Sequence, residues 1–308
     1  MKSGFVFLIC AALLAAPATA EPKEADKFTP GIARGHTLLR QPPAPARRPD
    51  AGFALISIIL DDLGEQYAAG LRAVGLPGAV ACAFLPYTRF SAAQAELAYA
   101  SGKEVLLHLP LQPGNAQPYR VALTLTSGRS DMAAYLESAL ASVPHARGLN
   151  NHQGSLLTRM PQHMGWLMDE IKLYPRLYFV DSRTSGASVA YRMALSRAVP
   201  AAERQVFLDT ERGEEAVRAA FHRLVQHARR NESALAIGHP YPETFKVLEQ
   251  ELPRLALYGV KLVPPSELIA SQSGQPVRDN QYKQLKLSPA LTLAATGRKL
   301  IAGSAAAH

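Results

Sequence analysis

Short polar motifs that contain acidic residues or histidine follow apolar runs at five places in this chain. They are Asp61-Asp62-Leu63-Gly64, His108-Leu109-Pro110, Asn150-Asn151-His152-Gln153-Gly154-Ser155, Asp181-Ser182-Arg183-Thr184 and Gly238-His239-Pro240. The ends of parallel strands are where α/β folds place their active sites. One or two carboxylates together with several imidazoles form the donor set of a catalytic divalent metal site. The motifs therefore predict a shared metal site at one end of a sheet.

Two adjacent carboxylates, Asp61 and Asp62, follow the predicted strand segment Ser57-Ile58-Ile59-Leu60. Successive residues of a strand point to opposite faces, so the two carboxylates need not share a role. One of them can bind a metal ion while the other accepts a proton from an attacking water. Alternatively, the pair caps the turn after the strand, and the sequence by itself leaves both interpretations open.

Two histidines occupy comparable positions at the ends of apolar runs. His108 closes the run 105–107 and is followed two residues later by a proline, and His239 follows the run 235–237. A lone histidine in such a position is usually structural, but its equivalence to the position of the aspartate pair favours a shared site. Imidazole titrates near neutral pH, so His239 is a candidate general acid.

The densest polar cluster is residues 150–155, which hold two amides, an imidazole, a glycine and a hydroxyl. This composition predicts neither a helix face nor a strand face. It is costly to bury unless every polar group is paired. We therefore expect Asn150, Asn151, His152 and Ser155 to serve a functional site.

A further acidic motif follows the apolar run 177–180. Asp181 and Arg183 either take part in the site, as groups that orient ligands or bind substrate, or pair with each other as a structural ion pair. Their positions in the sequence fit both interpretations.

Apolar runs alternate with amphipathic segments from residue 53 to about residue 270. The predicted strands are 54–60, 79–85, 104–108, 177–181, 205–208, 234–238 and 260–263. The predicted helices are 67–74, 91–100, 132–141, 162–173, 187–196, 214–231 and 243–257, and residues 113–130 form a longer loop. Strict alternation of strand and helix predicts an α/β fold with a parallel sheet and outer helices. About seven such units in residues 51–271 indicate one domain, either an irregular (β/α) barrel or a doubly wound sheet.

The two ends of the chain lack this pattern. Residues 1–20 combine Lys2, an apolar segment and an Ala-Thr-Ala cleavage site, which is typical of the signal peptide of an exported protein. Residues 21–50 are rich in proline and predict a linker, and residues 272–308 predict a poorly ordered basic tail. No later stretch approaches the length of a transmembrane helix.

The net charge of +8 belongs mostly to those ends, because residues 51–271 hold 21 Lys/Arg and 20 Asp/Glu. Basic residues interleaved with aromatic residues do not cluster anywhere, which excludes a nucleic-acid-binding groove. The chain also lacks a nucleophile elbow, a phosphate-binding glycine loop and an H-E-x-x-H motif.

After removal of residues 1–20, Cys82 is the single cysteine. We therefore expect no internal disulfide and a buried Cys82.

Six motifs taken together resemble the divergent polysaccharide deacetylase family, the periplasmic YibQ-like proteins related to NodB-type carbohydrate esterases. They are Ile59-Leu60-Asp61-Asp62-Leu63-Gly64, Leu107-His108-Leu109-Pro110, Gly148-Leu149-Asn150-Asn151-His152-Gln153-Gly154-Ser155, Phe179-Val180-Asp181-Ser182-Arg183-Thr184, Val206-Phe207-Leu208-Asp209 and Ile237-Gly238-His239-Pro240. They occur in order over about residues 53–270. The resemblance implies an irregular (β/α) barrel in an exported, periplasmic protein whose partner is a carbohydrate polymer.

The resemblance also implies a chemistry, the hydrolysis of N- or O-acetyl groups of envelope sugars with a divalent metal ion, for which we expect zinc. Carried over by motif, Asp61 is the base, Asp62 a metal ligand and His239 the acid, with His108 and His152 as the imidazole ligands. The groups expected to orient ligands or bind sugar hydroxyls are Asn150, Asn151, Ser155, Asp181 and Arg183. NodB-type enzymes carry both ligand histidines on one short motif. No second histidine follows His108 at that spacing, so the site here is assembled differently.

Two other functions remain open. A metal-dependent phosphoesterase can also carry Asn-His after a strand and a late Gly-His, but it needs an early D-x-H motif, which Asp61-Asp62-Leu63 does not supply. A non-catalytic periplasmic protein that keeps the fold and binds a glycan or a protein would retain the motifs without turnover. The motifs name neither the glycan nor the oligomeric state.

Overall fold

The computed structural model describes residues 52–274, so the predictions for residues 1–50 and for the tail beyond residue 274 lie outside the described residues. The strands are β1 (Ala54–Leu63), β2 (Ala81–Phe84), β3 (Val105–Leu111), β4 (Ala146–Gln153), β5 (Tyr178–Asp181), β6 (Ala201–Glu203), β7 (Val206–Phe207), β8 (Ser233–Gly238) and β9 (Val260–Leu262). The helices are α1 (Tyr67–Gly75), α2 (Ser91–Ala100), α3 (Arg129–Ser142), α4 (Pro161–Ile171), α5 (Ala190–Ser196), α6 (Glu214–Asn231), α7 (Pro242–Glu251) and α8 (Pro265–Ser273), with the 3-10 helices η1 (Leu157–Arg159) and η2 (Leu252–Tyr258). Within the described range, no helix has the length and apolar character needed to cross a membrane.

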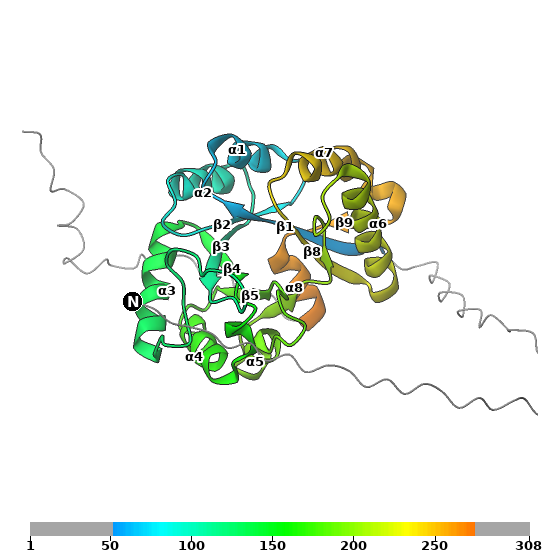
Figure 1. Ribbon diagram of the computed structural model, residues 1–308. Helices are drawn as coiled ribbons and strands as arrows, with labels where there is room; N and C mark the ends of the chain where they lie inside the picture. Colours follow the sequence, from blue (N-terminus) through cyan, green and yellow to red (C-terminus); the bar gives the residue numbers. More distant parts are fainter. Residues whose placement is uncertain (1–51, 275–308) are drawn as a thin grey trace, which may run out of the picture. The chain divides into compact units, whose positions relative to one another are not determined.

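The strands form one parallel sheet in the order β6-β5-β4-β3-β2-β1-β8-β7, and β9 pairs with the first residues of β1. Helices α1 to α7 surround the sheet on its outer side, whereas α8 lies nearer the centre (Figure 1). The sheet curls into a half-barrel, so the predicted irregular (β/α) barrel is confirmed. β6 and β7 stand at the two ends of the strand order, so the barrel is open between them.

The described residues 52–274 form nine strands where the sequence predicts about seven. The prediction that residues 150–155 have no strand face is wrong, because residues 150–153 end β4. This strand pairs with β3 from the Val105–Ala146 partners to the Leu111–Gln153 partners. The second missed strand, β6, has only three residues, which is too short for a readable period.

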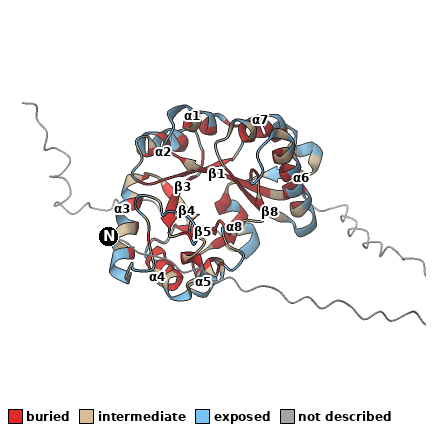
Figure 2. Cartoon of the chain, viewed as in Figure 1, coloured by how far each residue is buried: buried red, intermediate tan, exposed pale blue. Residues whose placement is uncertain are grey.

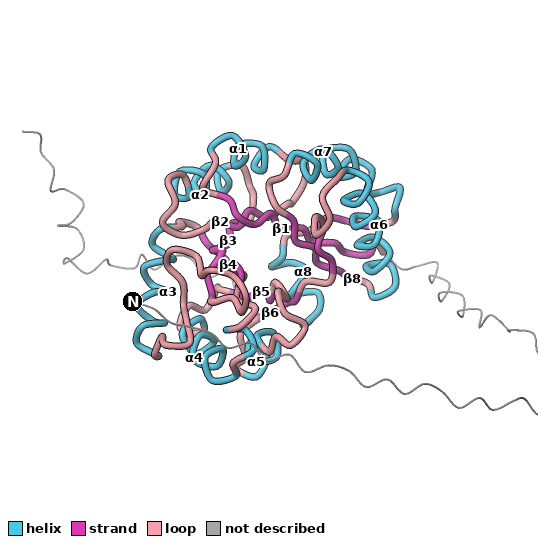
Figure 3. Tube along the Cα trace, in the orientation of Figure 1, coloured by secondary structure: helices cyan, strands magenta, loops and turns pink. Residues whose placement is uncertain are grey.

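The connections follow the prediction with one correction. Residues 112–128 link β3 to α3 as a long loop (Figure 3), with an isolated bridge between Leu111 and Leu123. The single helix predicted over 243–257 is divided, because α7 ends at Glu251 and η2 follows it. Pro253 lacks the backbone N–H that an α-helix needs at this point, which explains the change.

The core has two parts, one on each face of the sheet. Ile58 and Leu60 of β1 belong to the outer part, which the buried sides of the helices cover (Figure 2). Inside the curl, Ile59 of β1 belongs to a smaller cluster that includes Leu268 of α8. The free thiol of Cys82 is buried in the outer part, as expected, and burial raises its pKa to about 12.

The inner cluster forms the floor beneath the polar motifs. Every second residue of a strand points into the curl. On β1, Ile59 of the inner cluster precedes Asp61 by two positions, and on β3 Leu106 precedes His108 by the same interval. Apolar residues thus fill the middle of the barrel, and the next residues on the same face bring polar groups to its carboxyl end.

Candidate metal centre

Asp61 and Asp62 both reach His108, although neighbouring strand residues ordinarily point apart. The pairing of β1 with β2 shifts register between Leu60 and Leu63, and Asp62 has a φ of 56°. Such a positive φ is uncommon for aspartate and marks a locally forced backbone. As a result, Asp61 Oδ2 and Asp62 Oδ1 lie 3.5 and 3.2 Å from His108 Nε2.

All three predicted ligands meet at this point, and they are Asp62, His108 and His152. One possible ligand atom of each lies within 4.8 Å of the other two. Asp62 Oδ1 is 2.9 Å from His152 Nδ1, and His152 Nδ1 is 3.2 Å from His108 Nε2. One carboxylate and two imidazoles at this spacing match the donor set of a catalytic zinc site. The three side chains therefore fit a divalent ion, and binding itself stays a prediction.

Asn150 fixes two members of the cluster at once. Its amide nitrogen donates a hydrogen bond to Asp61 Oδ1 at 2.7 Å, and its carbonyl oxygen lies 2.9 Å from His108 Nδ1. An amide oxygen can only accept, so the His108 proton is on Nδ1. In the neutral imidazole, His108 Nε2 therefore keeps a lone pair that is directed at the cluster, as a metal ligand requires.

The two carboxylates differ in electrostatics. Asp61 is almost fully buried, and burial raises its pKa in spite of the charges of His108 and His239. For Asp62, burial alone would raise the pKa, but hydrogen bonds from His108 and His152 outweigh it and hold the pKa well below its usual range. Asp61 is thus the better proton acceptor, and Asp62 is the better permanent anion.

His239, the residue directly after β8, faces the same cluster and is paired with Asp209. Its Nε2 is 3.8 Å from Asp62 Oδ2, and its Nδ1 is 2.9 Å from Asp209 Oδ1. Asp209 Oδ2 also accepts the backbone N–H of His239 and the hydroxyl of Thr244. Burial lowers the pKa of His239, but the hydrogen bond to Asp209 and the charges of Asp61, Asp209 and Asp62 outweigh burial and raise it to about 9.

Asp209 is a candidate functional residue that the sequence analysis did not assign to the site. It lies in a motif that carries the family resemblance, directly after the predicted strand 205–208. Its position as an acidic residue at the carboxyl end of a predicted strand is therefore the sequence feature by which Asp209 could have been assigned to the site.

Two other predicted residues support the site from outside the cluster. The side-chain oxygen of Asn151 accepts the backbone N–H of Ser182 at 2.9 Å, and its amide donates to the Gln153 carbonyl at 2.8 Å. These bonds tie the end of β4 to the loop after β5. Ser155 accepts the backbone N–H of Gly114 at 2.9 Å and so holds the long loop after β3.

Asp181 and Arg183 serve the connection between β5 and α5. Asp181 accepts the backbone N–H of Arg183 at 2.8 Å and the hydroxyl of Ser188 at 2.6 Å. The Arg183 guanidinium lies 3.6 Å from Glu203 Oε2. Asp181 and Arg183 therefore do not form the mutual ion pair that was one of the two alternatives, and these contacts hold the connection between β5 and α5.

Aromatic rings, which the sequence analysis did not single out, flank the polar cluster. Tyr119 of the long loop packs edge-on against the His152 ring, with centroids 5.2 Å apart. Phe207 and Tyr241 lie 5.2 and 5.5 Å from the His239 ring. The candidate centre is thus bordered by groups that can contact a bulky ligand.

Comparison with known proteins relates this site to a family. The sequence model for "divergent polysaccharide deacetylase" matches residues 58–269. The uncharacterized protein YibQ of Escherichia coli is 36% identical over 70% of this chain and 67% of its own length. An uncharacterized protein of Haemophilus influenzae is 32% identical over 70% of this chain and 80% of its own length.

A solved structure has the same fold. The crystal structure of an uncharacterized protein from Agrobacterium tumefaciens C58 superposes with a TM-score of 0.67 and 22% identity, covering 71% of this chain and 90% of that chain. The extent of the sequence match includes every strand from β2 to β9 and the whole polar cluster. The chain belongs to the divergent polysaccharide deacetylase family.

Proposed function

We propose that this chain is a metal-dependent hydrolase that removes acetyl groups from glycans of the cell envelope. The observation that carries the proposal is the cluster of Asp62, His108 and His152, whose donor atoms lie within 4.8 Å of one another. Asp61 and His239 lie beside this cluster. Three ligands, a base and an acid are the groups that metal-assisted hydrolysis of an amide or ester uses.

Asp62, His108 and His152 would hold a divalent ion, and two imidazoles with one carboxylate favour zinc. Such an ion supplies Lewis acidity to the acetyl carbonyl and to the attacking water. Within residues 52–274 these residues form the single group of this kind, which favours a one-ion hydrolase over a phosphoesterase with paired ions.

Asp61 would act as the base. Its Oδ1 is occupied by the Asn150 amide, so Oδ2, which faces His108, is the oxygen that can take a proton from water. Burial raises the pKa of Asp61, which makes its carboxylate a stronger proton acceptor. Asn150 keeps the carboxylate from rotating.

His239 would act as the acid. Its Nδ1 is directed at Asp209, and its Nε2 faces the cluster. With a pKa of about 9, the imidazole carries its proton at neutral pH. The Nε2 proton can then pass to the leaving amine or alkoxide, while Asp209 stabilises the imidazolium and holds the ring orientation.

The cellular location is part of the proposal. Residues 1–20 have the composition of a signal peptide, so we expect export, and the family resemblance favours the periplasm. The carbohydrate partner follows from membership of a polysaccharide deacetylase family. An envelope glycan with N- or O-acetyl groups satisfies both expectations.

The test is acetate release by zinc-loaded protein from acetylated chitin-type, peptidoglycan-type and O-acetylated substrates. Asp61→Asn should slow release by about 10²–10⁴-fold, the usual contribution of a positioned base, and should keep the metal and the fold. Asp169→Asn is the matched control, because Asp169 pairs with Arg197 on the outer helices. Unchanged release in Asp61→Asn would remove this base from the mechanism. No release by the parent protein from any of the three substrates would favour the non-catalytic binder.

A further inference from the structure

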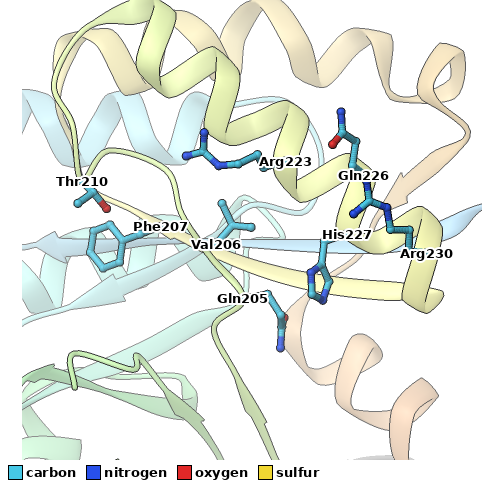
Figure 4. A pocket seen from close by; sticks show the side chains of 8 residues that line it. All are labelled: Gln205, Val206, Phe207, Thr210, Arg223, Gln226, His227 and Arg230. Carbon is cyan, nitrogen blue, oxygen red and sulfur yellow. The ribbon is translucent and has the colours of Figure 1, made fainter. Parts of the chain in front are cut away.

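A cavity of about 470 Å³ lies at the open edge of the sheet, and the metal ligands do not line it. One wall comes from β7 and the residues next to it, including Gln205 and Phe207. The other wall comes from α6 (Figure 4). The volume is in the range of small-molecule sites, about 300–1,000 Å³.

The chain topology explains why a cavity forms here. Every other pair of successive strands is separated by a helix, but only two residues separate β6, which ends at Glu203, from β7, which begins at Val206. Among residues 52–274, no helix therefore covers the sheet between α5 and α6. On one side α6 packs against α7. Its other side carries Arg223, His227 and Arg230 along one helical stripe, at spacings of four and three residues.

The stripe gives the cavity a positive lining. Arg223 and Arg230 are exposed, and no acidic side chain is among the lining residues. Arg218 of the same helix has a carboxylate partner in Glu251. In the part of the chain that the structure describes, Arg223 and Arg230 have no ion-pair or hydrogen-bond partner. Guanidinium groups are the side chains that pair best with a carboxylate or a phosphate.

The remaining lining suits a polyhydroxylated ligand. Gln226 and Thr210 add an amide and a hydroxyl to the walls. The side-chain oxygen of Gln205 accepts the Leu235 N–H at 2.7 Å, so its amide N–H groups are what it can offer a ligand. These neutral donors and acceptors match sugar hydroxyls, whereas the arginines match an acidic group.

The chain's own ends do not fit this cavity by charge. Residues 1–50 carry seven Lys/Arg against four Asp/Glu, and residues 272–308 carry five against one. Basic segments would be repelled by the arginine stripe. An external anion is the better occupant.

We propose that this edge cavity binds an acidic sugar unit, with Arg223 and Arg230 holding its carboxylate or phosphate. Phe207 connects the cavity with the metal centre, because it lines the cavity and its ring lies 5.2 Å from that of His239. On the proposed deacetylase function, the bound unit is then part of an acidic glycan whose acetylated neighbour reaches the metal centre. The binding itself does not depend on that function.

The test is calorimetric titration of the full chain with four probes: glucose 6-phosphate, glucuronate, glucose and inorganic phosphate. We expect binding of the phosphate sugar, the carboxylate sugar or both, and at least about tenfold weaker binding of glucose and of inorganic phosphate, since each lacks half of the complementary groups. Preference between the first two probes identifies the acidic group. The acidic-sugar assignment would be overturned if glucose bound as tightly as the acidic sugars. It would also be overturned if inorganic phosphate bound and none of the sugars did.

Variants locate the bound probe. Arg223→Gln and Arg230→Gln should each weaken binding of the acidic sugar about fivefold or more, which corresponds to the loss of one charged partner at a partly open site. Arg229→Gln is the matched control, because Arg229 is an exposed residue of α6 that does not line the cavity. An equal loss in Arg229→Gln, or no binding of either acidic sugar, would refute the proposal. Neither measurement needs metal or turnover, so failure here is separate from failure of the deacetylase proposal.

Discussion

The two ends of the barrel interior both bury charged side chains, but they arrange them differently. At the amino ends of the strands, Glu104 accepts the hydroxyl of Tyr178 at 2.6 Å and the backbone N–H and hydroxyl of Ser266 at 2.9 and 2.5 Å. At the carboxyl ends, Asp61 and Asp62 both approach one nitrogen of His108. The first cluster joins one carboxylate to several donors, whereas the second brings two carboxylates to a single imidazole nitrogen.

This difference separates a structural cluster from a candidate site. Around Glu104, the carboxylate accepts hydrogen bonds from Tyr178 and Ser266. These bonds connect α8 with β5 and with the residue directly before β3. In the other cluster one His108 proton is on Nδ1, so unless Nε2 carries a second proton, Nε2 and the oxygen of Asp62 meet as lone pairs. A buried convergence of this kind is unfavourable unless a proton or a cation satisfies it. The comparison therefore predicts that substitutions at the carboxyl end of the strands change metal binding. Substitutions at the amino end should change only the free energy of unfolding.

Asn150→Leu gives the largest expected change, because it removes the group that orients both His108 and Asp61. We expect metal affinity to fall by about 10–100-fold, the usual effect of losing such an orienting partner. Asn151→Leu is the control, since Asn151 bonds to Ser182 and Gln153 instead. Competition with a chelator measures both. An equal fall in the two variants would show that Asn150 does not act through the ligands.

Tyr178→Phe tests the other end of the barrel. Glu104 loses one donor in a buried setting, so the free energy of unfolding should fall by about 1–3 kcal/mol. Bound metal should not change, because Tyr178 does not contact the ligands. Denaturant unfolding and metal analysis of the same sample separate the two effects. A loss of metal in a folded Tyr178→Phe variant would break the proposed division between the two ends.

Asp209→Asn gives a smaller effect that appears in the pH profile. Burial by itself lowers the pKa of His239, and the carboxylate of Asp209 is a main cause of its rise to about 9. The acid is active while protonated, so turnover is present below this pKa and is lost as pH rises through it. Removing the charge should move the alkaline decline of acetate release to lower pH. A decline at the same pH in parent and variant would exclude His239 as the group that titrates.

The fold could be predicted from the sequence because its strands are apolar and alternate regularly with helices. The runs 54–60 and 234–238 read as buried strands and appear as β1 and β8. β4 could not be found in this way, because its residues Asn150 and His152 are polar. Both side chains take part in the polar cluster. The polar cluster at the end of that strand interrupts the hydrophobic pattern on which strand prediction depends.

The candidate site could be predicted in its residue types but not in its detail. The position of Asp61, Asp62 and His108 at strand ends indicated a shared site. The left-handed backbone at Asp62, which turns its carboxylate toward His108, follows from the irregular pairing of β1 with β2 and has no signal in the sequence. For Asp181, the sequence does not say which face of β5 the side chain occupies, so its contacts with Arg183 and Ser188 could not be predicted.

The most direct test of the account is the metal content of the full chain. Metal-stripped protein is reloaded with zinc, free zinc is removed, and bound zinc is measured by elemental analysis. We predict about one zinc per chain in the parent protein, as the three-ligand cluster requires, with loss in Asp62→Asn and in His108→Gln. Asp169→Asn, which changes a carboxylate outside the cluster, should keep it. No zinc in the parent protein, or equal zinc in the parent and Asp62→Asn, would contradict the account.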